Sequence, residues 1–427
     1  MNIVSIIAEY NPFHLGHAYQ IDTARKSAGA GSAVLAVMSG SFTQRGEPAL
    51  TDKWSRTRMA LNGGIDLVIE LPFPYACASA ERFASGAVQL LHKTGLDSTL
   101  FFGSESGDLE ALKTVAGWLK PESHTFRRQL KSYLNEGHSF PRARQLALSD
   151  ITGQDQRVDL LEQPNNILAI EYLKAIQSID RCRLTPKTIQ RIGQSHHSDQ
   201  LPDSRMPASA NAIRRTVLEQ IGEGNTTGLY VMLDSLQDAM PTAALAELMT
   251  RIQSGPGPLS LEHLSLPILT ILRSRSPSEL SSVSSMGEGL PERLCQSAER
   301  LESNADQRIA RLIDQARTRR FPQTRIQRAL IAMLAGLTDN DLALFDASGG
   351  PAYIRVLGFT RKGRYLLKMM RKKAECPIIT RASDFLEYGG QLPLKRMAAL
   401  DLTASDIWQI AAGQACGVDF DRSVIMI

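Results

Sequence analysis

The sequence predicts an α/β fold, with a parallel sheet in the first half of the chain and a mostly α-helical C-terminal region. From residue 3 to about residue 220, short apolar runs alternate with segments of helical spacing, as is typical of βαβ units. Beyond that point the apolar runs thin out and helical spacing dominates. We therefore expect one domain over residues 1–220 and a second over residues 221–427.

The first predicted unit is a strand, a tight turn and a helix. Residues 3–7 read Ile-Val-Ser-Ile-Ile, as expected for a central parallel strand covered on both faces. The pair at residues 11–12, Asn-Pro, favours a turn because proline restricts both its own backbone and that of its predecessor. Residues 17–26 have helical spacing, so His14 and His17 flank the start of a helix, where backbone N–H groups and the helix dipole attract anions.

His14 and His17 are the candidate catalytic residues. A single histidine at a helix start is more often a cap or a packed side chain. Two imidazoles on either side of Gly16, directly after an apolar strand, can donate hydrogen bonds to a phosphate and to the charge that develops on it. The pair therefore predicts a site that handles the phosphates of ATP.

Further strand and helix signals continue the alternation. The expected strands are residues 33–38, 65–71 and 98–102, and the expected helices are about residues 51–61 and 79–93. Three polar loops follow strands, at residues 11–17, 39–45 and 103–107. Because the carboxyl ends of parallel strands meet at one edge of a sheet, these loops are expected to converge on a ligand.

Residues downstream of the predicted sheet add polar groups. Asn166 lies at the start of an apolar helix and either caps it or donates to a nucleotide. A strand-like run at residues 188–192 is followed by residues 195–199, whose adjacent histidines are interpreted as a polar loop and not as a metal site. Residues 208–214 place small polar side chains and an arginine at a helix start, a pattern that suits phosphate binding.

Length and composition are those of a globular chain. The 427 residues include 43% hydrophobic residues, and no apolar run approaches the ~20 residues that span a bilayer. The chain opens without a basic region and apolar leader, so we expect a cytoplasmic protein with no membrane partner. A net charge of +4 makes any nucleic-acid surface local, and five cysteines without CxxC spacing indicate reduced thiols and no metal site.

Several segments together resemble one family. They are residues 9–17 (Glu-Tyr-Asn-Pro-Phe-His-Leu-Gly-His), 38–49, 52–54, 66–72, 102–105, 164–168 and 353–358. Over most of its length the chain is similar to the bacterial tRNA(Met) cytidine acetate ligases, HUP-type nucleotidyltransferases with a Rossmann-like parallel sheet and an HxGH motif. The resemblance implies activation of acetate by ATP as acetyl-adenylate, with Mg²⁺, and acetylation of the wobble cytidine amine of elongator tRNA(Met).

The resemblance also implies which residues bind ATP. They are Ile7, Ala8, Glu9, Tyr10, Asn11, Pro12, Phe13, His14, Leu15, Gly16, His17, Ala18, Tyr19, Gln20, Gly103, Asn166, Arg191, Ser209 and Arg214. At one position the chain departs from the superfamily, because Asn211 stands where Ser or Thr is common. The contact that this position makes with the triphosphate therefore stays open.

Basic residues supply candidate contacts with tRNA. Arg45, Lys53 and Arg56 are candidates for phosphate or tRNA, with solvated surface charge as the alternative. In the second half, basic residues alternate with aromatic ones, a composition that suits an RNA backbone. These are Arg317, Arg319, Arg320, Arg325 and Arg328 around Phe321, and then Arg361, Lys362 and the basic residues up to Lys373. A basic helix face is more often merely solvated, but an enzyme that holds a tRNA favours the binding interpretation.

Three alternatives stay open. Residues 254–289, rich in Gly, Ser and Pro, form either a mobile connection or a helix pair with long loops. The protein as a whole is alternatively a small-molecule adenylyltransferase of the same superfamily, although such enzymes are often much shorter. It is alternatively a non-catalytic RNA-binding protein that has kept the fold, against which the intact His14, Gly16 and His17 argue.

Overall fold

The computed structural model describes the chain except for residues 121–122, 192–207, 223–225, 256, 302–306 and 389. The polar segment expected at residues 195–199 therefore lies outside the described residues. Within the described residues, no helix is both long and apolar enough to cross a membrane.

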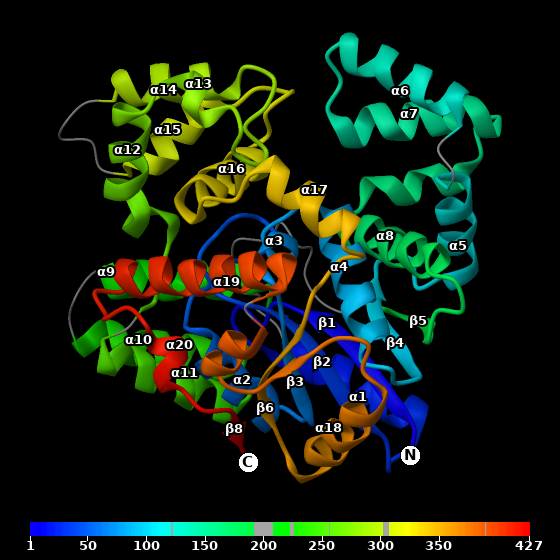
Figure 1. Ribbon diagram of the computed structural model, residues 1–427, viewed down its shortest axis with the longest axis vertical. Coiled ribbons are helices and arrows are strands. Elements are labelled where there is room, and N and C mark those ends of the chain that lie inside the picture. The colour runs from blue at the N-terminus through cyan, green and yellow to red at the C-terminus, as the bar shows by residue number, and fades with distance from the viewer. Residues whose placement is uncertain (121–122, 192–207, 223–225, 256, 302–306, 389) are drawn as a thin grey trace.

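A parallel sheet forms the centre of the first half, as expected (Figure 1). Its strands are β1 (Ile3–Ala8), β2 (Ala33–Ser39), β3 (Leu67–Leu71), β4 (Ser98–Ser104) and β5 (Leu184–Gln190). They lie in the order β3-β2-β1-β4-β5, with β1 paired in parallel to both β2 and β4. The order reverses between β1 and β4, and ligands of such sheets bind in the crevice beyond the carboxyl ends at this point.

Helices cover both faces of the sheet. In the first half they are α1 (Leu15–Ala28), α2 (Lys53–Asn62), α3 (Phe73–Ala76), α4 (Ala80–Lys93), α5 (Leu109–Trp118), α6 (His124–Asn135), α7 (Phe140–Thr152), the 3-10 helix η1 (Gln156–Glu162), α8 (Pro164–Ser178) and α9 (Ala210–Gly222). Side chains of β1 alternate between two apolar cores, as the pleat of a strand requires. Ile3 packs with α4 and α8 on one face, and Val4 and Ile6 pack with α1 and α2 on the other.

The second half is mostly helical, as predicted. Its helices are α10 (Thr226–Leu236), α11 (Thr242–Ser254), η2 (Leu261–Leu264), α12 (Ser265–Ser274), α13 (Pro277–Leu280), α14 (Leu290–Glu299), α15 (Arg308–Ala316), α16 (Gln323–Ala335), α17 (Asp339–Ala347), α18 (Arg361–Lys373), η3 (Ala382–Tyr388), α19 (Leu392–Ala411) and α20 (Val418–Asp421). Residues 254–289 contain η2, α12 and α13, so the helical alternative is confirmed for this segment.

Three strands of the second half extend the sheet, which the sequence did not predict. β6 (Ile354–Phe359) pairs antiparallel with β3, and β7 (Ile378–Ile379) and β8 (Ile425–Met426) pair with β6. These strands come from a chain stretch that is mostly helical, and two of them are too short to produce a pattern. The sheet is thus not confined to residues 1–220, and the division into two domains at residue 220 stays a prediction.

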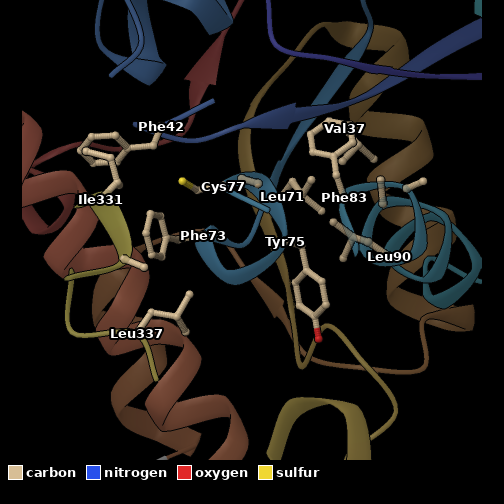
Figure 2. Close-up of a cluster of buried hydrophobic side chains, with 14 of the residues drawn as sticks. Val37, Phe42, Leu71, Phe73, Tyr75, Cys77, Phe83, Leu90, Ile331 and Leu337 are labelled. Carbon is tan, nitrogen blue, oxygen red and sulfur yellow. The ribbon is translucent and has the colours of Figure 1, made fainter. Parts of the chain in front are cut away.

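The two halves also share an apolar core. Figure 2 shows Ile331 of α16 and Leu337 beside Phe42 and Phe73, which belong to the first half. All four side chains are buried, and Phe42 and Phe73 contact each other edge to face, with ring centroids 6.0 Å apart. Helix α16 is therefore anchored directly on the loop that follows β2.

A buried ionic network joins the same two halves. The Nζ atom of Lys53 in α2 lies 2.9 Å from Oε1 of Glu70 in β3 and 2.8 Å from Oδ1 of Asp419 in α20. Arg355 of β6 adds a second cation, 3.6 Å from the same Asp419 oxygen. The Lys53 side chain is only 1% exposed, so the interpretation of Lys53 as a contact for phosphate or tRNA is wrong.

We expect Lys53→Ala to lower the free energy of unfolding by about 3–5 kcal/mol, because the substitution leaves buried carboxylates without their cation. Urea denaturation measures the change. Lys26→Ala is the matched control, since Lys26 pairs with Asp22 on the exposed face of α1, and its unfolding curve should overlay that of the wild type. A loss below about 1 kcal/mol for Lys53→Ala would contradict the structural role of the network.

Candidate active site

The two histidines form a reciprocal cap at the start of α1. The Nδ1 atom of His14 accepts the backbone N–H of Gly16 at 3.0 Å, and the Nδ1 atom of His17 accepts the backbone N–H of His14 at 3.2 Å. A neutral imidazole that accepts at Nδ1 carries its proton on Nε2. Both rings therefore present Nε2–H as their donor, on the side of each ring opposite to the cap.

The histidine rings lie stacked, with centroids 3.8 Å apart and an interplanar angle of 29°. Tyr10 and Phe13, both fully buried, contact the ring of His17 at centroid distances of 4.9 and 5.6 Å. Burial, followed by the charges of His14 and Arg191, holds the pKa of His17 well below its ordinary value of 6.5. His17 is thus a neutral hydrogen-bond donor at neutral pH, and the apolar rings behind it restrict its orientation.

Residues 7–20 differ in their exposure. The buried ones are Tyr10, Asn11, Pro12, Phe13 and His14, the partly open ones are Ile7, Ala8, Glu9, Gly16, His17, Ala18 and Gln20, and the exposed ones are Leu15 and Tyr19. Gln20 donates to the carbonyl oxygen of Phe101 in β4 at 3.4 Å, which ties α1 to the neighbouring strand.

A buried arginine binds main-chain oxygens at the carboxyl edge of the sheet. The guanidinium of Arg56 donates to the carbonyl oxygens of Glu9 at 2.8 Å, Ser39 at 3.0 Å and Thr51 at 3.1 Å, and also to that of Gly40. Its side chain is fully buried, and burial lowers its pKa to about 10. The interpretation of Arg56 as a contact for phosphate or tRNA is therefore wrong, because its donors bind main-chain oxygens of the protein.

The loop after β2 lies between the site and α16. The backbone N–H of Gln44 donates to Oε1 of Glu9 at 2.7 Å on the site side. On the other side, a Cβ at Gly46, where φ is +82°, would lie 2.4 Å from the backbone nitrogen of Arg328 in α16. Only glycine suits that backbone conformation so close to the backbone of α16. The loop after β2 therefore packs directly between the site and the helical half.

The segment at residues 208–214 reaches the same place from α9. Ser209 accepts the backbone N–H of Ala212 at 3.0 Å, as a helix cap does. Arg214 donates to the carbonyl oxygen of Asn11 at 3.2 Å and lies 3.3 Å from Oε2 of Glu47, and it also bonds the side chain of Asn211. The structure thus brings Arg214 beside the histidine turn, with Ser209 at the start of the same helix.

Across the switch point, the loop after β4 is tied to α8. Glu105 accepts the backbone N–H of Asn166 at 2.7 Å and the side chain of Asn165 at 2.6 Å. In return, Oδ1 of the fully buried Asn166 accepts the backbone N–H groups of Glu105 at 3.0 Å and Ser106 at 3.2 Å. Asn166 is the third residue of α8 and not its cap, so the capping alternative is wrong.

Arg191 and Gly103 lie on the same side of the switch point as Glu105 and Asn166. Arg191 donates to Oδ1 of Asn165 at 3.0 Å, and a Cβ at Gly103 would lie 3.0 Å from its side chain. Gly103 therefore makes room for the arginine, which lies close enough to influence His17. Glu105 and Asn165 have no role predicted from the sequence, although both lie in segments that carry the resemblance.

The predicted tRNA contacts near α16 fall into different environments. Arg45 is half-buried in the loop beside Glu9, and Arg328 donates to the carbonyl oxygen of Gln44 at 3.5 Å. Arg320 and Arg325 both pair with Glu288, at 3.3 and 2.9 Å. Arg319 is exposed at the turn between α15 and α16, so the turn presents positive charge to solvent.

Arg361 and Lys362 lie far from the histidines. They begin α18, which follows the antiparallel strand β6, and the last residue of β6 pairs with Leu67 at the start of β3. The backbone N–H of Thr360 donates to the carbonyl oxygen of Asp66 at 2.9 Å, just before β3. These two residues are therefore at the amino edge of the sheet, opposite to the site (Figure 1).

A sheet of order β3-β2-β1-β4-β5 with a His-x-Gly-His helix start at its switch point is the arrangement of a nucleotidyltransferase. A family model described as HIGH Nucleotidyl Transferase matches residues 1–422. The chain is 36% identical to the tRNA(Met) cytidine acetate ligase of Acetivibrio thermocellus and 38% identical to that of a Thermoanaerobacter species, with 100% of each chain covered. It belongs to the tRNA(Met) cytidine acetate ligase family.

Solved structures agree with this assignment. Thermotoga maritima TmcAL without ligand superposes with a TM-score of 0.90 at 32% identity, and the same protein bound with alpha-thio ATP superposes with a TM-score of 0.88 at 31% identity. Both comparisons cover 100% of each chain. The fold class predicted from the sequence, a parallel sheet followed by a mostly helical region, is thereby confirmed.

We expect His17 to stay neutral well below pH 6.5, because burial opposes its protonation, and so do the charge of Arg191 and the charge that His14 would carry if protonated. An NMR titration of the His17 ring measures this directly. Arg191→Ala should raise the pKa of His17 toward its ordinary value, since the substitution removes one of those charges. Protonation of His17 near pH 6.5 in the unaltered protein would contradict the assignment of a neutral donor.

Proposed function

We propose that this protein is an ATP-dependent ligase that acetylates the exocyclic amine of the wobble cytidine of elongator tRNA(Met), using free acetate. The observation that best supports this function is the reciprocal cap, which sets two Nε2–H donors at a helix N-terminus on the switch point of the sheet. The relatives that match the full chain carry the name of this activity, and one TmcAL structure holds an ATP analogue.

In the first step an acetate oxygen attacks the α-phosphorus of ATP and pyrophosphate leaves. Catalysis of such a displacement depends mainly on positioning and on stabilisation of the developing charge. His14 and His17 donate to phosphate oxygens from the start of α1, where the helix dipole adds to their effect. Ser209 and Arg214 are proposed to hold the triphosphate, with Gly103, Asn166 and Arg191 along the nucleoside.

Mg²⁺ is part of the same proposal. Nucleotide sites usually bind this ion through phosphate oxygens, waters and one or two carboxylates. Bound to the triphosphate, the ion would neutralise charge on the leaving pyrophosphate. Among the described residues, no group of three or more His, Cys, Asp or Glu side chains is arranged as a metal site.

In the second step the cytidine amine attacks the carbonyl carbon of the acetyl-adenylate and AMP leaves. Neither step needs a covalent bond to the enzyme, so the function requires no nucleophilic serine or cysteine. The tRNA is proposed to lie against Arg45, the turn that carries Arg319 and Arg320, and Arg325 and Arg328 of α16. Contacts with Arg361 and Lys362 require that the tRNA also reach the opposite edge of the sheet.

Neither alternative is favoured by a feature of the structure. The basic turn between α15 and α16 is not required by a small-molecule adenylyltransferase, and the histidine pair is not required by a non-catalytic RNA-binding protein.

The cytoplasmic location of the protein stays a prediction.

Loss of one imidazole tests the first step. His17→Ala should reduce acetate-dependent exchange of pyrophosphate into ATP by about 100-fold or more, because a donor to the developing charge is removed. Its affinity for tRNA(Met) should remain near that of the wild type, since His17 lies within the nucleotide site. Absence of acetate-dependent exchange in the unaltered protein, with tRNA binding retained, would refute the ligase proposal.

The basic turn is tested separately. The double substitution Arg319→Ala and Arg320→Ala should weaken tRNA binding and make the salt dependence of binding shallower, because fewer counterions are released. Pyrophosphate exchange should be preserved, as the turn lies outside the nucleotide site. Filter binding at several salt concentrations gives both quantities, and unchanged affinity and slope would show that the tRNA lies elsewhere.

A further inference from the structure

Glu9 carries a carboxylate at the switch point of the sheet. The phosphate chemistry proposed for the first step assigns no role to this carboxylate. It directly follows β1, whose residue Ile7 packs into the core formed with α4 and α8. Because side chains alternate along a strand, the Glu9 side chain lies on that same face. The histidine pair belongs to α1, which covers the other face. Glu9 and the phosphate donors are thus on opposite sides of the end of β1.

The carboxylate is held in one place. Its Oε1 atom accepts the backbone N–H of Gln44 at 2.7 Å, and its own carbonyl oxygen is bound by Arg56 at 2.8 Å. Glu9 is half-buried, so part of the residue remains accessible from solvent. A fixed, partly accessible carboxylate at this edge can meet a substrate without large movement.

Charged and titratable groups face Glu9 from every element around it. Arg45 and Glu47 belong to the loop after β2, Arg214 to α9 and Arg56 to α2, while the Cys77 thiol and the Tyr172 phenol lie on the α4 and α8 side. Burial outweighs the nearby arginines and raises the pKa of Glu9 above its ordinary value. A carboxylate in this state accepts a proton more readily than a solvated one.

The second step of the proposed reaction needs a proton acceptor. When the amine nitrogen attacks the acetyl carbon, a C–N bond forms, and the bond from that carbon to the phosphate oxygen breaks with its electron pair leaving on AMP. The nitrogen must then lose one N–H proton to become a neutral amide. His14 and His17 present N–H donors to phosphate, so they are poorly suited to accept this proton.

We infer that Glu9 is the general base of the acetyl transfer, accepting the proton that the cytidine amine loses as the C–N bond forms. This inference rests on the proposed function, because it assigns a residue to the second of its two steps. It also places the cytidine on the side of β1 that faces α4, α8 and the loop after β2. The nucleotide phosphates occupy the side that faces α1.

The test is Glu9→Gln in the full-length protein. Glutamine has the same shape, and its amide oxygen can still accept the backbone N–H of Gln44, so the loop should keep its position. Acetate-dependent pyrophosphate exchange of the same variant is the reference for the first step, because Glu9 belongs to the stretch that is expected to bind ATP, and exchange should fall far less than transfer. Single-turnover transfer of acetate to tRNA(Met) should fall by about 100-fold or more, the usual contribution of a general base.

The pH profile separates a base from a positioning residue. In the wild type the transfer rate should rise with pH as Glu9 loses its proton, and this rise should be missing from Glu9→Gln. Glu9→Asp, which keeps a carboxylate, should restore part of the transfer rate together with the rise. Equal losses of exchange and transfer in Glu9→Gln, or an unchanged transfer rate, would overturn the inference. Absence of exchange in the wild type would instead refute the proposed function.

Discussion

The site depends on the buried guanidinium of Arg56. Its donors bind carbonyl oxygens at the ends of β1 and β2 and at the start of α2, which brings three separate turns to one point. Hydrogen bonds from a charged donor to the main chain contribute on the order of 1.5–3 kcal/mol each. Without them the carbonyl groups at this edge would be buried and unsatisfied, and the turn that carries the histidines would lose its support.

The helical half is held to that same edge. Gly46 lies against the backbone of α16, Gln327 of α16 donates to Glu47 at 3.4 Å, and Glu47 in turn pairs with Arg214. A basic surface that is proposed to bind tRNA therefore contacts the loop that positions Glu9. This contact gives a direct physical route by which a bound tRNA can influence the second step of the reaction.

What the sequence predicted is mostly local. Four strands of the parallel sheet, the histidine turn and the helical second half follow from apolar spacing and turn chemistry within short windows. The fifth strand was predicted at residues 188–192 and lies at Leu184–Gln190. The pairing of β6 with β3 joins residues almost 300 positions apart in the chain, and no local pattern encodes such a partner. The role of Asn166 was also not predicted, because its Oδ1 atom accepts backbone N–H groups of another loop, those of Glu105 and Ser106.

Two basic residues that were predicted to contact phosphate or tRNA are buried structural residues instead, so a basic side chain in the sequence does not by itself indicate an exposed one. Lys53 and Arg56 stand beside Trp54 and Ser55 in a segment that reads as the exposed face of a helix, yet both are buried. Lys53 is neutralised by carboxylates from β3 and α20, and the N–H donors of Arg56 are satisfied by main-chain oxygens that carry no sequence signal. A buried cation is tolerated only where such partners exist. Its identity as a structural residue therefore depends on segments that the chain brings together only after folding.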